Sequence, residues 1–222
     1  EPSKLSDNDP RITLGMPPSG NANFLWVQHF AHHLSPNGQA GFVMPNGALA
    51  VSGKEGELRQ KLIGQDLVDV IISCPSKLFY NVSLPVSLWF LAKNKGGDRF
   101  RNRKGETLFI DARDTFEQIS RKQVIFNKEH ITKITDTVRA WRGESSSAKA
   151  SDGQRKKLEY KDIPGFCKSA NLEEIKKNGY TLTPGRYVGL ADIEDDGISF
   201  EEKMQKLSVE LREAFTNGRA LE

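Results

Sequence analysis

Few residues of this chain have the types and spacing that chemistry requires. His29, His32 and His33 lie together in a stretch with helical periodicity. His29 and His33 are four residues apart, a spacing that can hold a metal ion on one face of a helix, but no carboxylate or cysteine stands at ligand spacing from them. We interpret the three as half-buried helix side chains rather than metal ligands.

Other candidates for catalysis or cofactor binding are weak. The acidic run 192–196 lacks the glycine and the distal glutamate of a calcium loop, so we interpret it as a solvated turn. Cys74 and Cys167 are far apart and favour two reduced thiols. No glycine-rich strand-to-helix turn that would cradle a nucleotide occurs. We therefore predict no catalytic, cofactor-binding or metal-binding residue in this chain.

A basic segment, residues 93–106, has a composition that could hold DNA. Phe100 is interleaved among its cations, and such a loop can bind phosphates without reading sequence. The candidate phosphate contacts are Lys93, Lys95, Arg99, Arg101, Arg103 and Lys104. The alternative is a solvated hairpin tip, and the residues alone leave both interpretations open.

An aromatic pair, Phe79 and Tyr80, stands on a loop between Pro75 and Pro85. Prolines stiffen a loop and remove hydrogen-bond donors from it. The loop leads directly into the apolar run 86–92. On the residues alone, Phe79 fits best as a plug at the end of a sheet, and a stacking surface for a ligand is the alternative.

The elements that would position these residues alternate between helix and strand. Apolar periodicity predicts a helix within 21–34, capped by Asn21 or Asn23, and another from Ser52, and short apolar runs predict strands at 39–44 and 67–73. This alternation is typical of a parallel sheet with helices on its faces. The strand 86–92 follows without a helix, so we expect it to return antiparallel. A further strand, 107–112, is expected at an edge.

The chain is expected to divide into four parts. Residues 1–142 would form the main domain, ending in a helix that is capped near Asn127. Residues 143–157 are poor in apolar side chains and indicate a mobile linker. Residues 158–220 would form a helical tail for subunit assembly, and 221–222 are typical of a tag. The apolar seam expected to dock a partner consists of Phe200, Met204, Leu207 and Leu211.

Composition permits a folded core and sets few limits on partners. The chain has 222 residues, of which 37% are hydrophobic, and its formal net charge is +3. No apolar run approaches the length that spans a bilayer, so we expect a cytoplasmic protein without a membrane partner. A mild positive charge permits a polyanionic partner without requiring one.

Several longer motifs resemble the modification subunit of type I restriction–modification systems. They are "GMPPSGNANFLWVQHFAHHLSPNGQAGFVMPNGAL", "EGELRQKLIGQDLVDVIISCPSKLFYNVSLPVSLWFLAKNK", "LFIDA" and "NGYTLTPGRYV", in that order, and the resemblance runs from about Leu14 to Val188. That subunit is an adenine-specific DNA methyltransferase that uses S-adenosylmethionine. Its partners are DNA, a DNA-specificity subunit and a restriction motor subunit.

The resemblance implies a fold and a role for the aromatic loop. The fold is α/β, the C-terminal half of a Rossmann-like, S-adenosylmethionine-dependent methyltransferase sheet with one antiparallel strand, plus a helical C-terminal tail. Residues 39–44, 67–73 and 86–92 would be its fifth, sixth and antiparallel seventh strands. Phe79 then matches the aromatic residue that stacks on a flipped adenine in related enzymes, and Tyr80 adjoins it.

The resemblance also exposes a gap. The family's glycine-containing cofactor motif and its Asn-Pro-Pro-Phe motif are absent, and Pro17-Pro18 follows Met16 rather than an asparagine. We therefore expect a C-terminal part of the subunit that is inactive alone and does not bind S-adenosylmethionine. Two rival functions are a docking module for the specificity subunit and a non-specific DNA-binding module. An open edge at 39–44 would also permit a homodimer.

Overall fold

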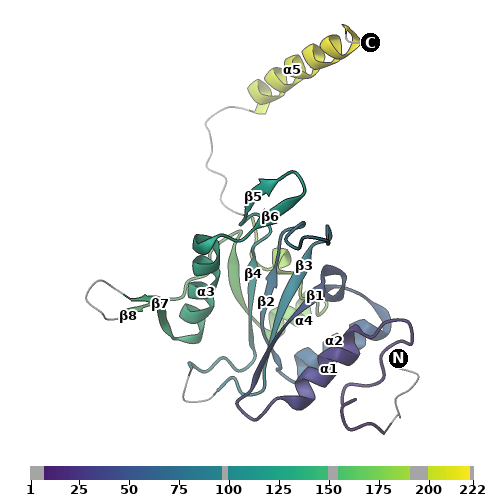
Figure 1. Ribbon diagram of the computed structural model, residues 1–222, viewed down its shortest axis with the longest axis vertical. Helices are drawn as coiled ribbons and strands as arrows, with labels where there is room; N and C mark the ends of the chain where they lie inside the picture. Colours follow the sequence, from purple (N-terminus) through teal and green to yellow (C-terminus); the bar gives the residue numbers. More distant parts are fainter. Residues whose placement is uncertain (1–7, 97–99, 150–154, 191–199, 221–222) are drawn as a thin grey trace. The chain divides into compact units, whose positions relative to one another are not determined.

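The computed structural model describes residues 8–96, 100–149, 155–190 and 200–220, and it divides into two compact units, 1–191 and 192–222 (Figure 1). The helices of the first unit are α1 (Asn23–His33), α2 (Gly53–Gly64), α3 (Lys128–Arg142) and α4 (Leu172–Lys177), with 3-10 turns η2 (Asn46–Leu49) and η3 (Pro184–Arg186). Its strands are β1 (Gln39–Pro45), β2 (Val68–Ser73), β3 (Val86–Ala92), β4 (Glu106–Asp111), β5 (Glu117–Ser120), β6 (Gln123–Ile125), β7 (Ser145–Lys149), β8 (Arg155–Lys157) and β9 (Cys167–Asn171).

The central sheet has the order β1-β3-β2-β4-β9. β3 lies between β1 and β2 and runs antiparallel to both, as the sequence predicted for strand 86–92. β2 and β4 are parallel, whereas β9 is antiparallel to β4. The sheet is therefore mixed and mostly antiparallel between neighbours, and the expectation of one antiparallel strand was wrong because β9 supplies a second.

The prediction that strand 107–112 lies at an edge was also wrong. β4 has a neighbour on each side, because β9 pairs with it from Ile110–Cys167 to Glu106–Asn171. At the other end of the sheet β1 pairs only with β3 among the described strands. The open edge expected at 39–44 is therefore present.

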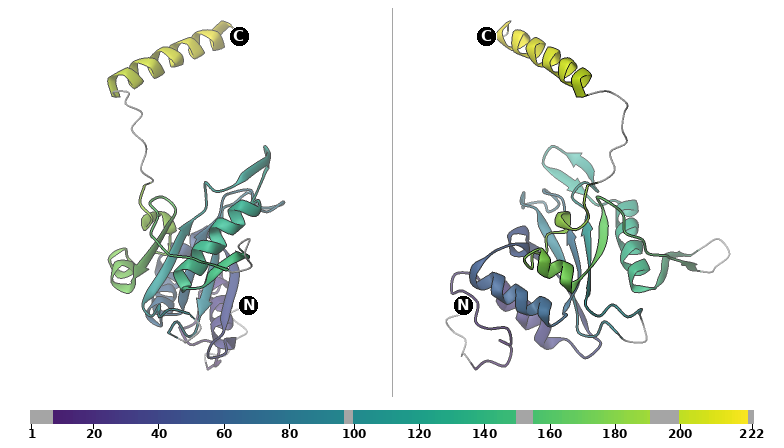
Figure 2. Two further views of the ribbon diagram at one scale, coloured as in Figure 1. Left: turned by 90° about the vertical axis from the view of Figure 1, so that its left-hand side faces the viewer. Right: turned by 180° about the vertical axis from the view of Figure 1, so that it is seen from behind.

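An apolar cluster lies on each face of the sheet. Figure 2 shows the helices that pack against these faces. α1 and α2 cover one face, where Phe24, Leu62 and Trp89 are fully buried. α3 covers part of the other face with Ile134 and Trp141. β2 is buried at every position because side chains of both faces lie under helices, which explains its nearly continuous apolar sequence.

Residues 158–190 belong to the first unit and are not part of a helical tail. β9 completes the sheet, and the Tyr187 ring stacks on Phe109 with centroids 3.9 Å apart. The boundary between the units lies after Ala191. Within 143–157, where a linker was predicted, β7 pairs with β8.

The second unit contains α5 (Phe200–Ala220). The predicted docking residues Met204, Leu207 and Leu211 are 50%, 60% and 58% exposed, whereas the Phe200 side chain lies outside the described residues. The helix itself is therefore present, with its apolar residues accessible. No described helix is both long enough and apolar enough to cross a membrane.

Ending the chain at Leu190 should leave the urea unfolding midpoint unchanged, because the first compact unit is then intact. Ending it at Lys157 removes β9 and Tyr187, so we expect no cooperative unfolding transition. Fluorescence of the buried Trp89 and Trp141 reports both experiments. Equal stability of the two truncated chains would contradict the boundary after Ala191.

Candidate functional site

The aromatic loop, residues 74–85, leaves the sheet at the carboxyl ends of the parallel strands β2 and β4. β2 ends at Ser73, β4 ends at Asp111, and β3 begins at Val86. The backbone N–H of Ala112 donates a 2.9 Å hydrogen bond to the Ser73 carbonyl, which holds the two strand ends together. Open α/β sheets bind ligands at this edge, so the aromatic loop stands where a ligand site is expected.

The rings of this loop are accessible. Phe79 is 42% exposed and Tyr80 is 85% exposed. The N–H of Val82 donates a 3.2 Å hydrogen bond to the Phe79 carbonyl, which closes a tight turn around the pair. This exposure does not fit the interpretation of Phe79 as a plug, since a plug would be buried, and it is compatible with a stacking surface.

The two cysteines have structural roles. Cys74 is buried directly after β2, where its N–H donates to the Val86 carbonyl at 2.9 Å. Burial raises the pKa of the Cys74 thiol to about 11, and it also raises the pKa of Cys167. Because the thiolate is the nucleophilic form, neither group is activated for catalysis at neutral pH.

The basic segment 93–106 leads from the end of β3 into β4. It lies at the amino end of β4, so the aromatic loop and this segment are at opposite ends of the strands. Inside it the Lys95 ammonium lies 2.7 Å from Asp66 and 2.7 Å from the Glu106 carbonyl, and its side chain is only 1% exposed. Burial lowers the pKa of Lys95. Its charge is used within the fold, so the predicted phosphate contact was wrong for this residue.

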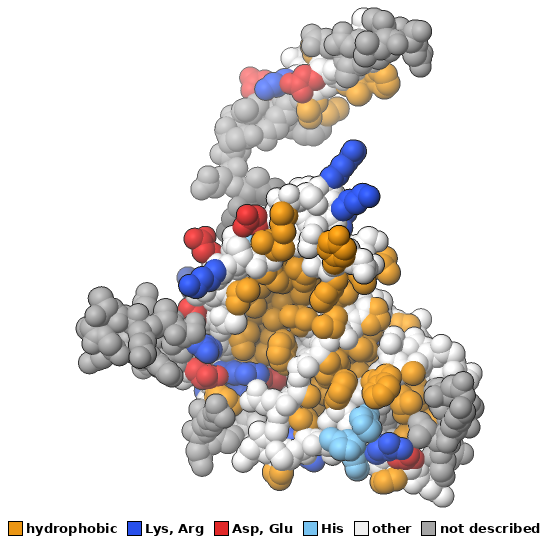
Figure 3. All heavy atoms as spheres, in the orientation of Figure 1, with side chains coloured by type: hydrophobic (Ala, Val, Ile, Leu, Met, Phe, Trp, Pro, Cys, Tyr) orange, Lys and Arg blue, Asp and Glu red, His pale blue; other side chains and the backbone are white. Residues whose placement is uncertain are grey.

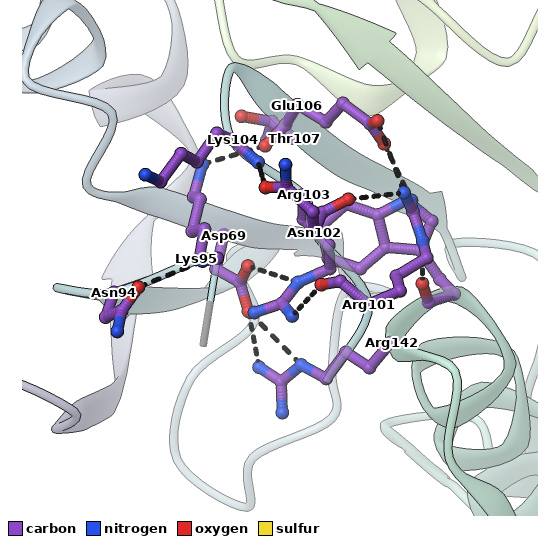
Figure 4. A network of polar contacts seen from close by, with 12 residues as sticks. Asp69, Asn94, Lys95, Arg101, Asn102, Arg103, Lys104, Glu106, Thr107 and Arg142 are labelled. Carbon is purple, nitrogen blue, oxygen red and sulfur yellow. Dashed lines mark hydrogen bonds and ion pairs between the residues drawn. The ribbon is translucent and has the colours of Figure 1, made fainter. Parts of the chain in front are cut away.

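Arg103 is fully buried in an ion network around Asp69 (Figure 4). Its Nε lies 3.2 Å from one oxygen of Asp69, and Arg142 from α3 contacts the other oxygen at 2.6 Å. Both guanidinium groups also lie over the Phe100 ring, at 5.2 and 5.6 Å from its centroid. The phosphate prediction was therefore wrong for Arg103 as well, because Asp69 neutralises it inside the protein.

The other cations of the segment differ from one another. Arg101 forms an ion pair with Glu106 at 2.6 Å and donates to the Trp141 carbonyl, so it is also committed to the fold. Lys93 and Lys104 are exposed, and Arg99 lies outside the described residues. Sequence reasoning missed Asp69, although a lone aspartate inside the apolar run "LVDVIIS" is a signal of a buried ion pair.

Two of the motifs that carry the resemblance meet in space. The N–H of Leu182, from "NGYTLTPGRYV", donates to the Leu49 carbonyl of "MPNGAL" at 2.8 Å. The Arg59 guanidinium links the same two segments by donating to the carbonyls of Tyr180 and Ala48 at 2.9 and 3.4 Å. These motifs therefore build the β1 end of the sheet together.

The histidine cluster shows no metal site. The rings of His29 and His33 have centroids 4.3 Å apart, and the Nδ1 of His33 lies 2.8 Å from the His29 carbonyl. Across the described ranges, no three His, Cys, Asp or Glu side chains converge on a position that would suit a metal ion.

Comparison with known proteins decides the family. A model described as N-6 DNA methylase matches residues 2–196, which is most of the chain. The chain belongs to this family. A type I restriction enzyme methylase subunit, MjaIX of Methanocaldococcus jannaschii, is 48% identical over 95% of this chain and 36% of its own length. The HindI methylase subunit of Haemophilus influenzae is 46% identical over 97% of this chain and 44% of its own.

Solved structures agree with this assignment. The methyltransferase subunit of a type I restriction–modification system from Streptococcus thermophilus superposes with a TM-score of 0.66 at 29% identity, covering 82% of this chain and 34% of that one. The EcoKI M protein shares the fold with a TM-score of 0.53 at 18% identity, covering 92% and 45%. This N-6 DNA methylase chain thus spans less than half the length of these relatives.

Replacing Asp69 by Asn should lower the free energy of unfolding by about 3 kcal/mol, because two guanidinium groups lose their buried carboxylate. Urea denaturation measures the loss. Asp114→Asn is the matched control, since Asp114 is exposed, and a change within about 0.5 kcal/mol is expected there. Equal stability of the two variants would show that the network does not stabilise the fold.

Proposed function

We propose that this chain is the part of a type I modification subunit that receives the target adenine, in an enzyme that methylates adenine N6 in DNA. The observation that carries the proposal is the exposed Phe79–Tyr80 pair at the carboxyl ends of β2 and β4. The family membership supports methyl transfer to DNA. The more specific parts of the proposal, that the target base is adenine and that it is flipped out of the duplex, are supported by the aromatic loop.

The chemistry explains why an aromatic surface is needed. The exocyclic amine of adenine cannot be reached inside a stacked duplex, so the base leaves the stack. A ring such as Phe79 replaces part of the lost stacking, which is worth about 1–3 kcal/mol per base. Tyr80, which is more exposed, adjoins it on the same turn. In this proposal both residues position the base and take no part in proton transfer.

S-adenosylmethionine is the methyl donor that the family generally uses. The residues of this chain do not fit it, because the sequence has no glycine-rich strand-to-helix turn and no Asn-Pro-Pro-Phe segment. We therefore assign donor binding to the portion of the longer relatives that this chain does not cover. On this proposal the chain alone neither binds the donor nor methylates DNA.

A second function, subunit docking, is favoured by α5. Its apolar residues Met204, Leu207 and Leu211 are exposed on one helix, a pattern that suits burial against partner helices. We propose the DNA-specificity subunit as this partner, and the restriction motor subunit as a further member of the complex. The open edge of β1 remains a candidate for pairing with a second copy.

Phe79→Ala in the full-length subunit, assembled with its specificity subunit, should lower kcat/KM for DNA methylation by about 5- to 150-fold, the equivalent of the stacking energy. Fluorescence of 2-aminopurine at the target position should show less extrahelical base. Leu190→Ala is the control, since Leu190 is 88% exposed and lies outside the aromatic loop. Wild-type rates and fluorescence in Phe79→Ala would remove the stacking role.

Leu207→Glu should abolish capture of the specificity subunit in a pull-down, because a carboxylate would enter the apolar interface. Lys206→Ala changes an exposed neighbour and should leave capture intact. Undiminished capture by Leu207→Glu would reject the docking role of α5.

A further inference from the structure

A two-stranded hairpin, β5–β6, is hydrogen-bonded to the aromatic loop. The N–H of Val124 in β6 donates to the Lys77 carbonyl at 3.2 Å, and the Lys77 ammonium donates to the Arg121 carbonyl at 3.1 Å. Lys77 has a φ of +62°, a left-handed conformation that is unfavourable for a non-glycine residue. The two hydrogen bonds hold this conformation and fix the hairpin tip beside the loop.

The hairpin tip and the adjoining Lys77 of the aromatic loop carry a surplus of positive charge. Lys77, Arg121 and Lys122 are exposed, and within the part of the chain that the structure describes none of them forms an ion pair. The acidic groups of this segment, Asp114 and Glu117, lie before and at the start of β5 rather than at the tip, and Glu117 accepts a 3.1 Å hydrogen bond from Asn127. The three cations therefore face solvent without a carboxylate partner.

Exposed apolar side chains surround these cations. Leu84 is 70% exposed on the aromatic loop, while Phe116 and Ile119 are 38% and 56% exposed beside and within β5. Figure 3 shows basic side chains next to hydrophobic ones around β5, β6 and the loop. Residues of the loop and the hairpin together line a hollow of about 540 Å³. Its lining includes Pro75, Pro85 and Phe116 and the charged residues Lys77, Arg113 and Asp114. Aromatic surfaces beside unpaired cations are the combination that binds unstacked nucleotides.

We propose that Lys77, Arg121 and Lys122 hold the DNA phosphates that flank the flipped adenine, so that the β5–β6 hairpin and the aromatic loop form one DNA-binding unit. This rests on the proposed function. A flipped nucleotide rotates about its backbone, so its neighbouring phosphates need fixed partners while the ring stacks. The basic segment 93–106 cannot serve this purpose, because it lies at the opposite end of the strands.

The double variant R121S/K122S tests this proposal in the full-length subunit assembled with its specificity subunit. Loss of two phosphate contacts should reduce the slope of log K against log salt by about 1.8, at about 0.9 per contact. KM for DNA should rise while kcat at saturating DNA stays unchanged, because the cations position the backbone and do not touch the reacting atoms.

The comparison variant is K93S/K104S, which removes the two exposed cations of the rival candidate, the basic segment 93–106. Its salt slope should equal that of the wild type. A normal slope in R121S/K122S, or an equal loss in both variants, would overturn the proposal. K122E provides a second test, because among the described residues the Lys122 side chain makes no hydrogen bond that the change would break. The KM of this variant for DNA should exceed that of the wild type. If the wild-type complex does not methylate DNA, the proposed function fails. If the wild-type complex methylates DNA, but the hairpin variants R121S/K122S and K122E have the salt slope and KM of the wild type, this inference fails and the proposed function does not.

Discussion

The placement of β3 between β1 and β2 is the constraint on which the rest of the structure depends. β3 runs antiparallel to both neighbours, so the chain returns from the end of β2 through one loop without crossing the sheet. That loop therefore stays at the carboxyl ends of β2 and β4. The next connection, 93–105, must lie at the other end of the strands, where β3 ends and β4 begins. The direction of β3 therefore places the aromatic residues and the basic residues at opposite ends of the sheet.

The ion network around Asp69 follows from the same arrangement. A carboxylate in the fully buried strand β2 needs cationic partners, because an isolated buried charge is strongly unfavourable. Arg103 arrives from the connection before β4, and Arg142 arrives from the last turn of α3. The network thus ties a connection and a helix to the central strand. Two cations of a segment that has the composition of a DNA-binding loop, Lys95 and Arg103, are instead buried in the interior.

Sequence patterns predicted the elements that are short apolar runs or that begin at a clear capping residue. Strands β1, β2 and β3 are apolar runs bounded by breakers, and Asn127 caps α3 by accepting from the N–H of His130 at 3.0 Å. β9 was missed because "CKSAN" is short and has only two buried residues, Cys167 and Ala170, which do not follow the alternating pattern of a strand. The β5–β6 hairpin was missed because all of β5 is exposed and lacks an apolar pattern. The structure was also needed to show which cations are neutralised, since Lys95 and Lys104 look alike in the sequence.

The central claim is that the target base meets the aromatic loop at the carboxyl ends of β2 and β4. Photocrosslinking tests it most directly, using a duplex with 5-iodouracil in place of the target adenine and the full-length subunit assembled with its specificity subunit. Peptide mapping should place the crosslink on Phe79 or Tyr80. A crosslink within residues 93–106, at the opposite end of the strands, would contradict the account.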